Sequence, residues 1–146
     1  MWMWGEFYCI RKIGVNTMKT WFIDIDGTIL EHRENKKIVE GCHEVLLPGA
    51  RDFVNNRFVE DVVILATARP EITRNITIKV LAEFGILYDQ IIFECGHRER
   101  IVVNDIKPVN AHDGGDRFEP FKTAYSLNVV RNMGLEKYKT YLTENK

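Results

Sequence analysis

Two aspartates, Asp24 and Asp26, follow a run of apolar residues and precede Gly27 and Thr28. The run Trp21–Ile25 predicts a buried strand, in which residues two apart point to the same side. We therefore expect both carboxylates to lie together where the strand ends. Because neighbouring carboxylates repel each other, a cation or a shared proton should accompany them. The alternative, an Asx turn without chemistry, fits less well with this context.

Polar residues also follow two later runs that predict strands. Val62–Ala66 is continuously apolar and ends at Thr67. Ile101–Val103 is a shorter run, and Asp105 follows it after one residue. Because the carboxyl ends of parallel strands share one edge of a sheet, we expect Asp24, Thr67 and Asp105 to meet there. Three polar groups at three strand ends predict a site at that edge.

The remaining elements complete an alternation of strands and helices. Two further strands are expected at Ile91–Phe93 and Ala124–Val130. Residues 29–47 read as a loop or flap, 48–58 as a short helix and the tail from Leu135 as helical. A longer helix from Pro70 to Gly85 would bury one stripe, namely Ile72, Ile76, Val80 and Phe84. This order predicts an α/β fold with a parallel sheet of about five strands and helices on both faces.

Composition limits the classes of protein that fit. The length of 146 residues suits one domain, expected over 18–146, and 45% hydrophobic residues indicate a packed core. Residues 1–17 are expected to be an extension, the alternative being an additional edge strand or a partner contact. With 20 basic and 21 acidic residues, charge favours neither nucleic acid nor a membrane as a partner. Three scattered cysteines predict a reducing, cytoplasmic setting without disulfides.

The D-x-D-G-T pattern after an apolar strand resembles the first motif of the haloacid dehalogenase (HAD) superfamily, which consists mostly of magnesium-dependent phosphatases. The resemblance implies a three-layer, Rossmann-like form of the expected fold. It also implies that Asp24 is the nucleophile and that Asp26 is the general acid and base. Thr67 resembles the second motif and would bind phosphate. Asp105 resembles the fourth motif and would hold Mg²⁺ with Asp24 and the backbone carbonyl of Asp26.

A third motif in that superfamily supplies a lysine or arginine that neutralises the phosphate and the nucleophile. The segment between the third and fourth expected strands, 94–100, contains no lysine. We therefore expect Arg98 or Arg100 to bind phosphate. Weaker candidates for the same role are Arg69, Lys79 and Lys107.

The site has no room for a cap domain, because residues 29–66 must also supply a helix and a strand. The chain resembles capless members, in particular small phosphatases of capsule and surface-polysaccharide synthesis. Their open sites accept large substrates or are covered by a neighbouring subunit of a homo-oligomer. The expected substrate is a sugar phosphate or another small phosphorylated metabolite.

Other functions remain open on this sequence. A polynucleotide or protein phosphatase would use the same capless site, and a non-catalytic Mg²⁺ or phosphate-binding module would keep the fold without turnover. A zinc site is disfavoured, because neither Cys42 with His43 nor Cys95 with His97 has the two-to-four-residue spacing of paired zinc ligands.

Overall fold

A computed structural model describes residues 18–57, 59–108 and 120–140. These residues form two compact units. The larger comprises 18–102 with 126–140, and the smaller comprises 103–108 with 120–125. The extension at 1–17 and Phe58, expected at the end of a helix, lie outside the described residues.

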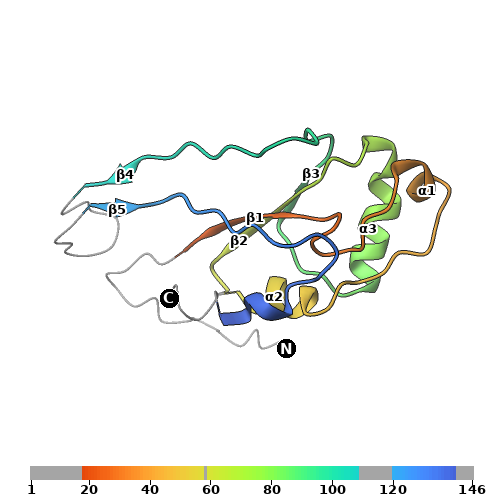
Figure 1. The fold of residues 1–146 in the computed structure, drawn as a ribbon, viewed down its shortest axis with the longest axis horizontal. Helices are drawn as coiled ribbons and strands as arrows, with labels where there is room; N and C mark the ends of the chain where they lie inside the picture. Colours follow the sequence, from red (N-terminus) through yellow and green to blue (C-terminus); the bar gives the residue numbers. More distant parts are fainter. Residues whose placement is uncertain (1–17, 58, 109–119, 141–146) are drawn as a thin grey trace, which may run out of the picture. The chain divides into compact units, whose positions relative to one another are not determined.

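A three-stranded parallel sheet organises the larger unit (Figure 1). Its order is β1 (Thr20–Asp24), β2 (Val62–Ala66) and β3 (Gln90–Ile92). Asp24 lies level with Ala66, which in turn lies level with Ile92. The three strands therefore end together, each within one residue of the predicted position, and the α/β class is confirmed.

The core lies against one face of this sheet. Ile23, Val63 and Leu65 point to that face and are at most 8% exposed. Phe22 and Ile92, on the opposite face, are 56% and 46% exposed. The helices expected on both faces are therefore not seen in the described chain, where the hydrophobic core occupies one side.

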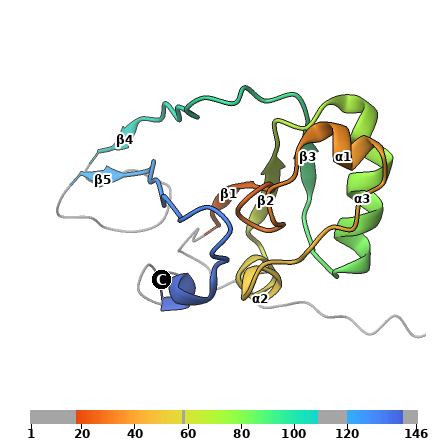
Figure 2. The ribbon, with the colours of Figure 1, turned by 45° about the vertical axis from the view of Figure 1, so that its right-hand side comes forward.

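Short helices, which Figure 2 shows beside the sheet, and the loops that flank them supply the other core residues. They are α1 (Asn35–Val39), α2 (Ala50–Asn55), α3 (Arg74–Glu83), and the 3-10 turns Glu71–Thr73 and Glu136–Tyr138. Phe53 and Val54 of α2 and Leu81 of α3 join the same core cluster. None of the described helices is long and apolar enough to span a membrane.

The stripe predicted for helix α3 is confirmed only in part, because Val80 and Phe84 pack against the core while partly buried. The expected stripe begins at Ile72, which is 77% exposed. The fully buried stripe starts one residue later and comprises Thr73, Thr77 and Leu81. Thr77 lies on the buried side because its hydroxyl accepts a hydrogen bond from buried Arg69 at 2.9 Å. Hydrophobic periodicity alone does not detect such a contact.

The fourth and fifth strands differ from the prediction. Residues 101–103 and 124–130 have no regular structure. Instead β4 (Ile106–Lys107) pairs antiparallel with β5 (Phe121–Lys122) in the smaller unit. Ile101 and Val103 are 84% and 92% exposed. Apolar, β-branched residues favour strands chiefly when a neighbour packs on them, and these two have no such cover.

Candidate functional site

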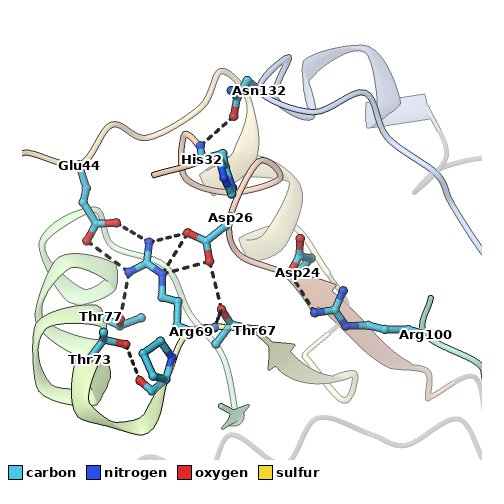
Figure 3. Close-up of polar contacts among 11 residues, drawn as sticks. Asp24, Asp26, His32, Glu44, Thr67, Arg69, Thr73, Thr77, Arg100 and Asn132 are labelled. Carbon is cyan, nitrogen blue, oxygen red and sulfur yellow. Dashed lines mark hydrogen bonds and ion pairs between the residues drawn. The ribbon is translucent and has the colours of Figure 1, made fainter. Parts of the chain in front are cut away.

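Asp24 is the last residue of β1, and its side chain is 34% exposed. One Nη of Arg100 lies 3.3 Å from Asp24 Oδ1 and also 3.3 Å from the Ala66 carbonyl (Figure 3). Burial is the largest influence and raises the pKa of Asp24 above its ordinary value. The Arg100 charge partly offsets this and Asp26 adds to it, while Arg131 lowers the pKa slightly. Asp24 is thus a half-buried carboxylate beside a guanidinium.

Asp26 lies two residues beyond Asp24 and is held by two partners. Its Oδ1 accepts hydrogen bonds from Arg69 Nε at 3.0 Å and Nη2 at 2.8 Å. Its Oδ2 accepts from Arg69 Nε and Thr67 Oγ1, both at 3.1 Å. Bidentate guanidinium contacts fix a carboxylate in orientation as well as in charge. Arg69 and Thr67 therefore hold the Asp26 carboxylate in one orientation, and the Asp26 side chain is only 16% exposed.

Arg69 reaches a second carboxylate, that of Glu44 (Figure 3). Both Nη atoms of Arg69 donate to Glu44, with Nη1 at 3.3 Å, and Nη1 also donates to Thr77. The side chains of Arg69 and Glu44 are 0% and 1% exposed. Burial lowers the pKa of Arg69, but its hydrogen bonds to Asp26 and Glu44 outweigh this and raise the pKa. With all three groups ionised, one positive charge faces two negative charges.

Thr67 follows β2 and is completely buried. Its hydroxyl donates to Asp26 and accepts the backbone N–H of Arg69 at 3.1 Å. Its backbone N–H donates to the Ile92 carbonyl, and its own carbonyl accepts from Cys95, both at 2.9 Å. Thr67 thus links the ends of β2 and β3 through its backbone and contacts Asp26 through its hydroxyl. Its predicted contact with phosphate stays a prediction.

A pocket of about 100 Å³ opens above these groups. It is lined by the following residues: Asp24, Asp26, His32, Arg33, Asn35, Ala68, Arg69, Gly96, His97, Arg100 and Arg131. Both aspartates therefore face a hollow with four arginines. Carboxylates and guanidinium groups at one small hollow suit nucleophilic attack on an anionic centre.

The segment after residue 126 reaches this pocket through the turn that follows Asp26. Asn132 donates its backbone N–H to the Gly27 carbonyl at 2.9 Å. The Asn132 side chain accepts the backbone N–H of His32 at 2.8 Å (Figure 3). Asn132 has a φ of 62°, which asparagine tolerates better than most residues. These contacts carry Arg131 to the pocket.

Of the predicted site residues, the structure brings together Asp24, Asp26, Thr67 and Arg100. Arg98 is exposed and forms no hydrogen bond or ion pair with the described residues. Asp105 belongs to the smaller unit, where its carboxylate pairs with Lys107 at 3.3 Å. Its place in a magnesium site stays a prediction.

Oxygen ligands for Mg²⁺ are present near Asp24. Its carboxylate lines the pocket, and the Asp26 carbonyl accepts no hydrogen bond from the described residues. Hard oxygen donors of these two kinds suit Mg²⁺, which keeps several waters as further ligands. No group of three or more His, Cys, Asp or Glu side chains among the described residues is arranged to hold a metal. The described site therefore offers Mg²⁺ few protein ligands, and water molecules would have to supply the others.

Sequence reasoning missed three features of this site. Glu44 lies in a polar segment with no periodic signal, and Arg131 lies far along the chain from any motif. Arg69 was a weak candidate for binding phosphate, yet its guanidinium is committed to Asp26 and Glu44. The one available signal was the Ala-Arg-Pro that follows Thr67, because it places Arg69 two residues after a predicted site residue.

Comparison with family models, curated proteins and solved structures finds no match to this chain.

Proposed function

We propose that the chain is a Mg²⁺-dependent phosphomonoester hydrolase of the HAD type, with Asp24 as its nucleophile. The observation that carries the proposal is the arrangement at one edge of the sheet. Asp24 contacts Arg100 there, while Asp26 is oriented by Arg69 and Thr67. A half-buried nucleophile at a pocket, beside a second, fixed carboxylate, suits a two-step phosphoryl transfer.

In the first step, an Asp24 oxygen forms a bond to phosphorus while the bond from phosphorus to the leaving alkoxide breaks. The product is an aspartyl-phosphate. Attack by a carboxylate on an anionic phosphate is repulsive unless positive charge is close. Arg100, 3.3 Å from Asp24, supplies one such charge. In the second step, water attacks phosphorus and releases Asp24 and inorganic phosphate.

Asp26 is proposed to give its proton to the departing alkoxide and later to take one from the attacking water. Its contacts with Arg69 and Thr67 keep the carboxylate in one orientation. Arg69 faces two carboxylates, so the cluster carries one excess negative charge when all three groups are ionised. A nearby cation relieves that excess.

Mg²⁺ would be held by the Asp24 carboxylate, the Asp26 carbonyl and, by resemblance, Asp105. When bound, it would neutralise charge on the phosphate and on Asp24. The surrounding protein groups orient the carboxylates around that position.

The finer fold and the substrate class belong to the same proposal. A three-layer, Rossmann-like sheet of about five strands would accompany a HAD-type site. Residues 29–66 supply α1, α2 and β2, which leaves little chain for a cap domain between β1 and β2 and supports the proposed capless form. A small, polar pocket without a cap suits a sugar phosphate or a similar metabolite.

A second candidate, a non-catalytic Mg²⁺ or phosphate-binding module, is favoured by one observation. Both oxygens of Asp26 already accept hydrogen bonds from Arg69, and one also accepts from Thr67. Proton transfer requires at least one of these bonds to break. If the network is too rigid for that, the site binds without turnover.

Release of phosphate from an aryl phosphate distinguishes the two. We expect release by the wild type that stops on removal of Mg²⁺ with a chelator, and a loss of about a thousandfold or more in Asp24→Asn. Asp52→Asn, an exposed carboxylate of α2 away from the pocket, serves as the matched control and should retain activity. No release by a folded wild type whose melting temperature still rises with Mg²⁺ would favour the binding module instead.

A further inference from the structure

Arg131 brings to the pocket a positive charge that forms no ion pair with a carboxylate of the described residues, although it lies near enough to Asp24 to lower the pKa of that carboxyl. Four arginines line the pocket. Arg33 pairs with Glu31 at 2.6 Å, while Arg69 and Arg100 pair with the site carboxylates. Arg131 forms no ion pair or hydrogen bond within the part of the chain that the structure describes.

The stem of Arg131 lies directly against the turn that carries the two aspartates. A Cβ built on Gly27 would lie 2.9 Å from Arg131 Cγ and 3.7 Å from its Nε. Gly27 has a φ of 82° and no side chain, so the arginine stem approaches its backbone closely. The neighbouring Asn132 anchors the backbone to Gly27 and His32. The contact with Gly27 and the hydrogen bonds of Asn132 therefore hold Arg131 beside the site.

An exposed arginine is ordinarily solvated and needs no ligand. Arg131 differs in two respects that are independent of each other. It lines the same pocket as Asp24 and Arg100, and the residues that follow it are held by backbone hydrogen bonds. Leu135, four residues further on, is 1% exposed and donates its N–H to the Pro48 carbonyl at 2.8 Å. The segment thus holds the exposed Arg131 at the rim of the pocket.

We propose that Arg131 binds the phosphoryl group of the substrate together with Arg100. The inference rests on the proposed function, because the phosphoryl group is the one on which Asp24 acts. A guanidinium presents two parallel N–H donors that match the oxygens of a phosphate, and its charge needs no proton to be supplied. Inorganic phosphate, as the product, has the same oxyanion chemistry and binds at the same place.

Calorimetric titration of the full chain with inorganic phosphate tests the inference without turnover. Arg131→Gln should bind phosphate about tenfold more weakly than the wild type, the loss of one charge-assisted contact. Arg131→Lys, which keeps the charge and loses the fork, should fall between them. Arg51→Gln removes an exposed arginine of α2 that does not line the pocket, and should bind as the wild type does.

Equal phosphate affinity in wild type and Arg131→Gln overturns the inference, as does a wild type that binds no phosphate. An unchanged far-ultraviolet circular dichroism spectrum in Arg131→Gln shows that a weaker affinity is not a loss of folding. The proposed function fails separately, when the wild type releases no phosphate from an aryl phosphate. Affinity that depends on Arg131 in an inactive wild type would keep the phosphate site and reject the hydrolase.

Discussion

Arg69 binds Asp26 and Glu44 at once, and the side chains of Arg69 and Glu44 are withdrawn from water. Taking charges out of water is costly, and only close, geometrically matched partners offset that cost. The network spans a strand end, a polar loop and helix α3, since Thr77 also accepts from Arg69. Its role at the residue scale is to fix Asp26 in one orientation. Because these contacts are buried, we expect the stability of the larger unit to depend on them as well.

Removal of the Arg69 guanidinium should therefore destabilise the protein. We expect Arg69→Met to lower the free energy of unfolding by about 3 to 5 kcal/mol, because the buried Glu44 carboxylate loses its partner. Urea denaturation measures the change, with Arg51→Met as the control for loss of an exposed arginine. A loss no larger than that of the control would show that the network contributes little to folding.

At the scale of elements, the turn at 131–135 is the piece that completes the pocket. Gly134 has a φ of 73°, and a Cβ built there would lie 2.2 Å from the Pro48 carbonyl oxygen. The contact leaves no room for a side chain, so the turn and the start of α2 approach backbone to backbone. The close fit of Gly134 against Pro48 fixes this turn, and with it the position of Arg131 three residues earlier.

Gly134→Ala tests this fit against a matched glycine. Gly41 also has a positive φ, 77°, but a Cβ there meets nothing within 4 Å. Gly41→Ala should cost about 1 kcal/mol from backbone strain alone. Gly134→Ala should cost about 1 to 3 kcal/mol more, because the added methyl must displace backbone. It should also weaken phosphate binding, measured by the same titration. Equal costs in the two variants would contradict the close approach.

The elements also show what the sequence could and could not predict. Val62–Ala66 was predicted correctly, because a buried central strand is a continuous apolar run bounded by polar residues. The run at 101–103 has the same local composition and forms no strand, since strand formation depends on neighbours that a local pattern does not reveal.

The site, too, could be predicted from the sequence only in part. Asp24, Asp26 and Thr67 follow apolar runs, so the topology of a parallel sheet suffices to bring them together. Glu44 and Arg131 reach the site through loop and turn contacts, which have no periodicity to detect. Arg100 and Arg98 are separated by one residue, and no pattern distinguishes which of them contacts Asp24.

At the scale of the whole molecule, the groups that contact Asp24 and Asp26 all belong to the larger unit. They come from the segment that follows β2, which supplies Thr67 and Arg69, and from the segment near residue 100. The nucleophile, its counter-charge and the oriented second carboxylate thus depend on one core. Asp105, in the smaller unit, is the predicted contribution from outside that core.

Chemical trapping of the phosphorylated enzyme tests the central claim, that Asp24 is the nucleophile, most directly. Borohydride reduces an acyl phosphate to an alcohol and leaves free carboxylates unchanged, so quenching during turnover of an aryl phosphate marks the attacking residue. Peptide mapping by mass spectrometry should find homoserine at position 24, and only when both substrate and Mg²⁺ are present. Turnover with an unmodified Asp24, or with the mark at Asp26, would contradict the account.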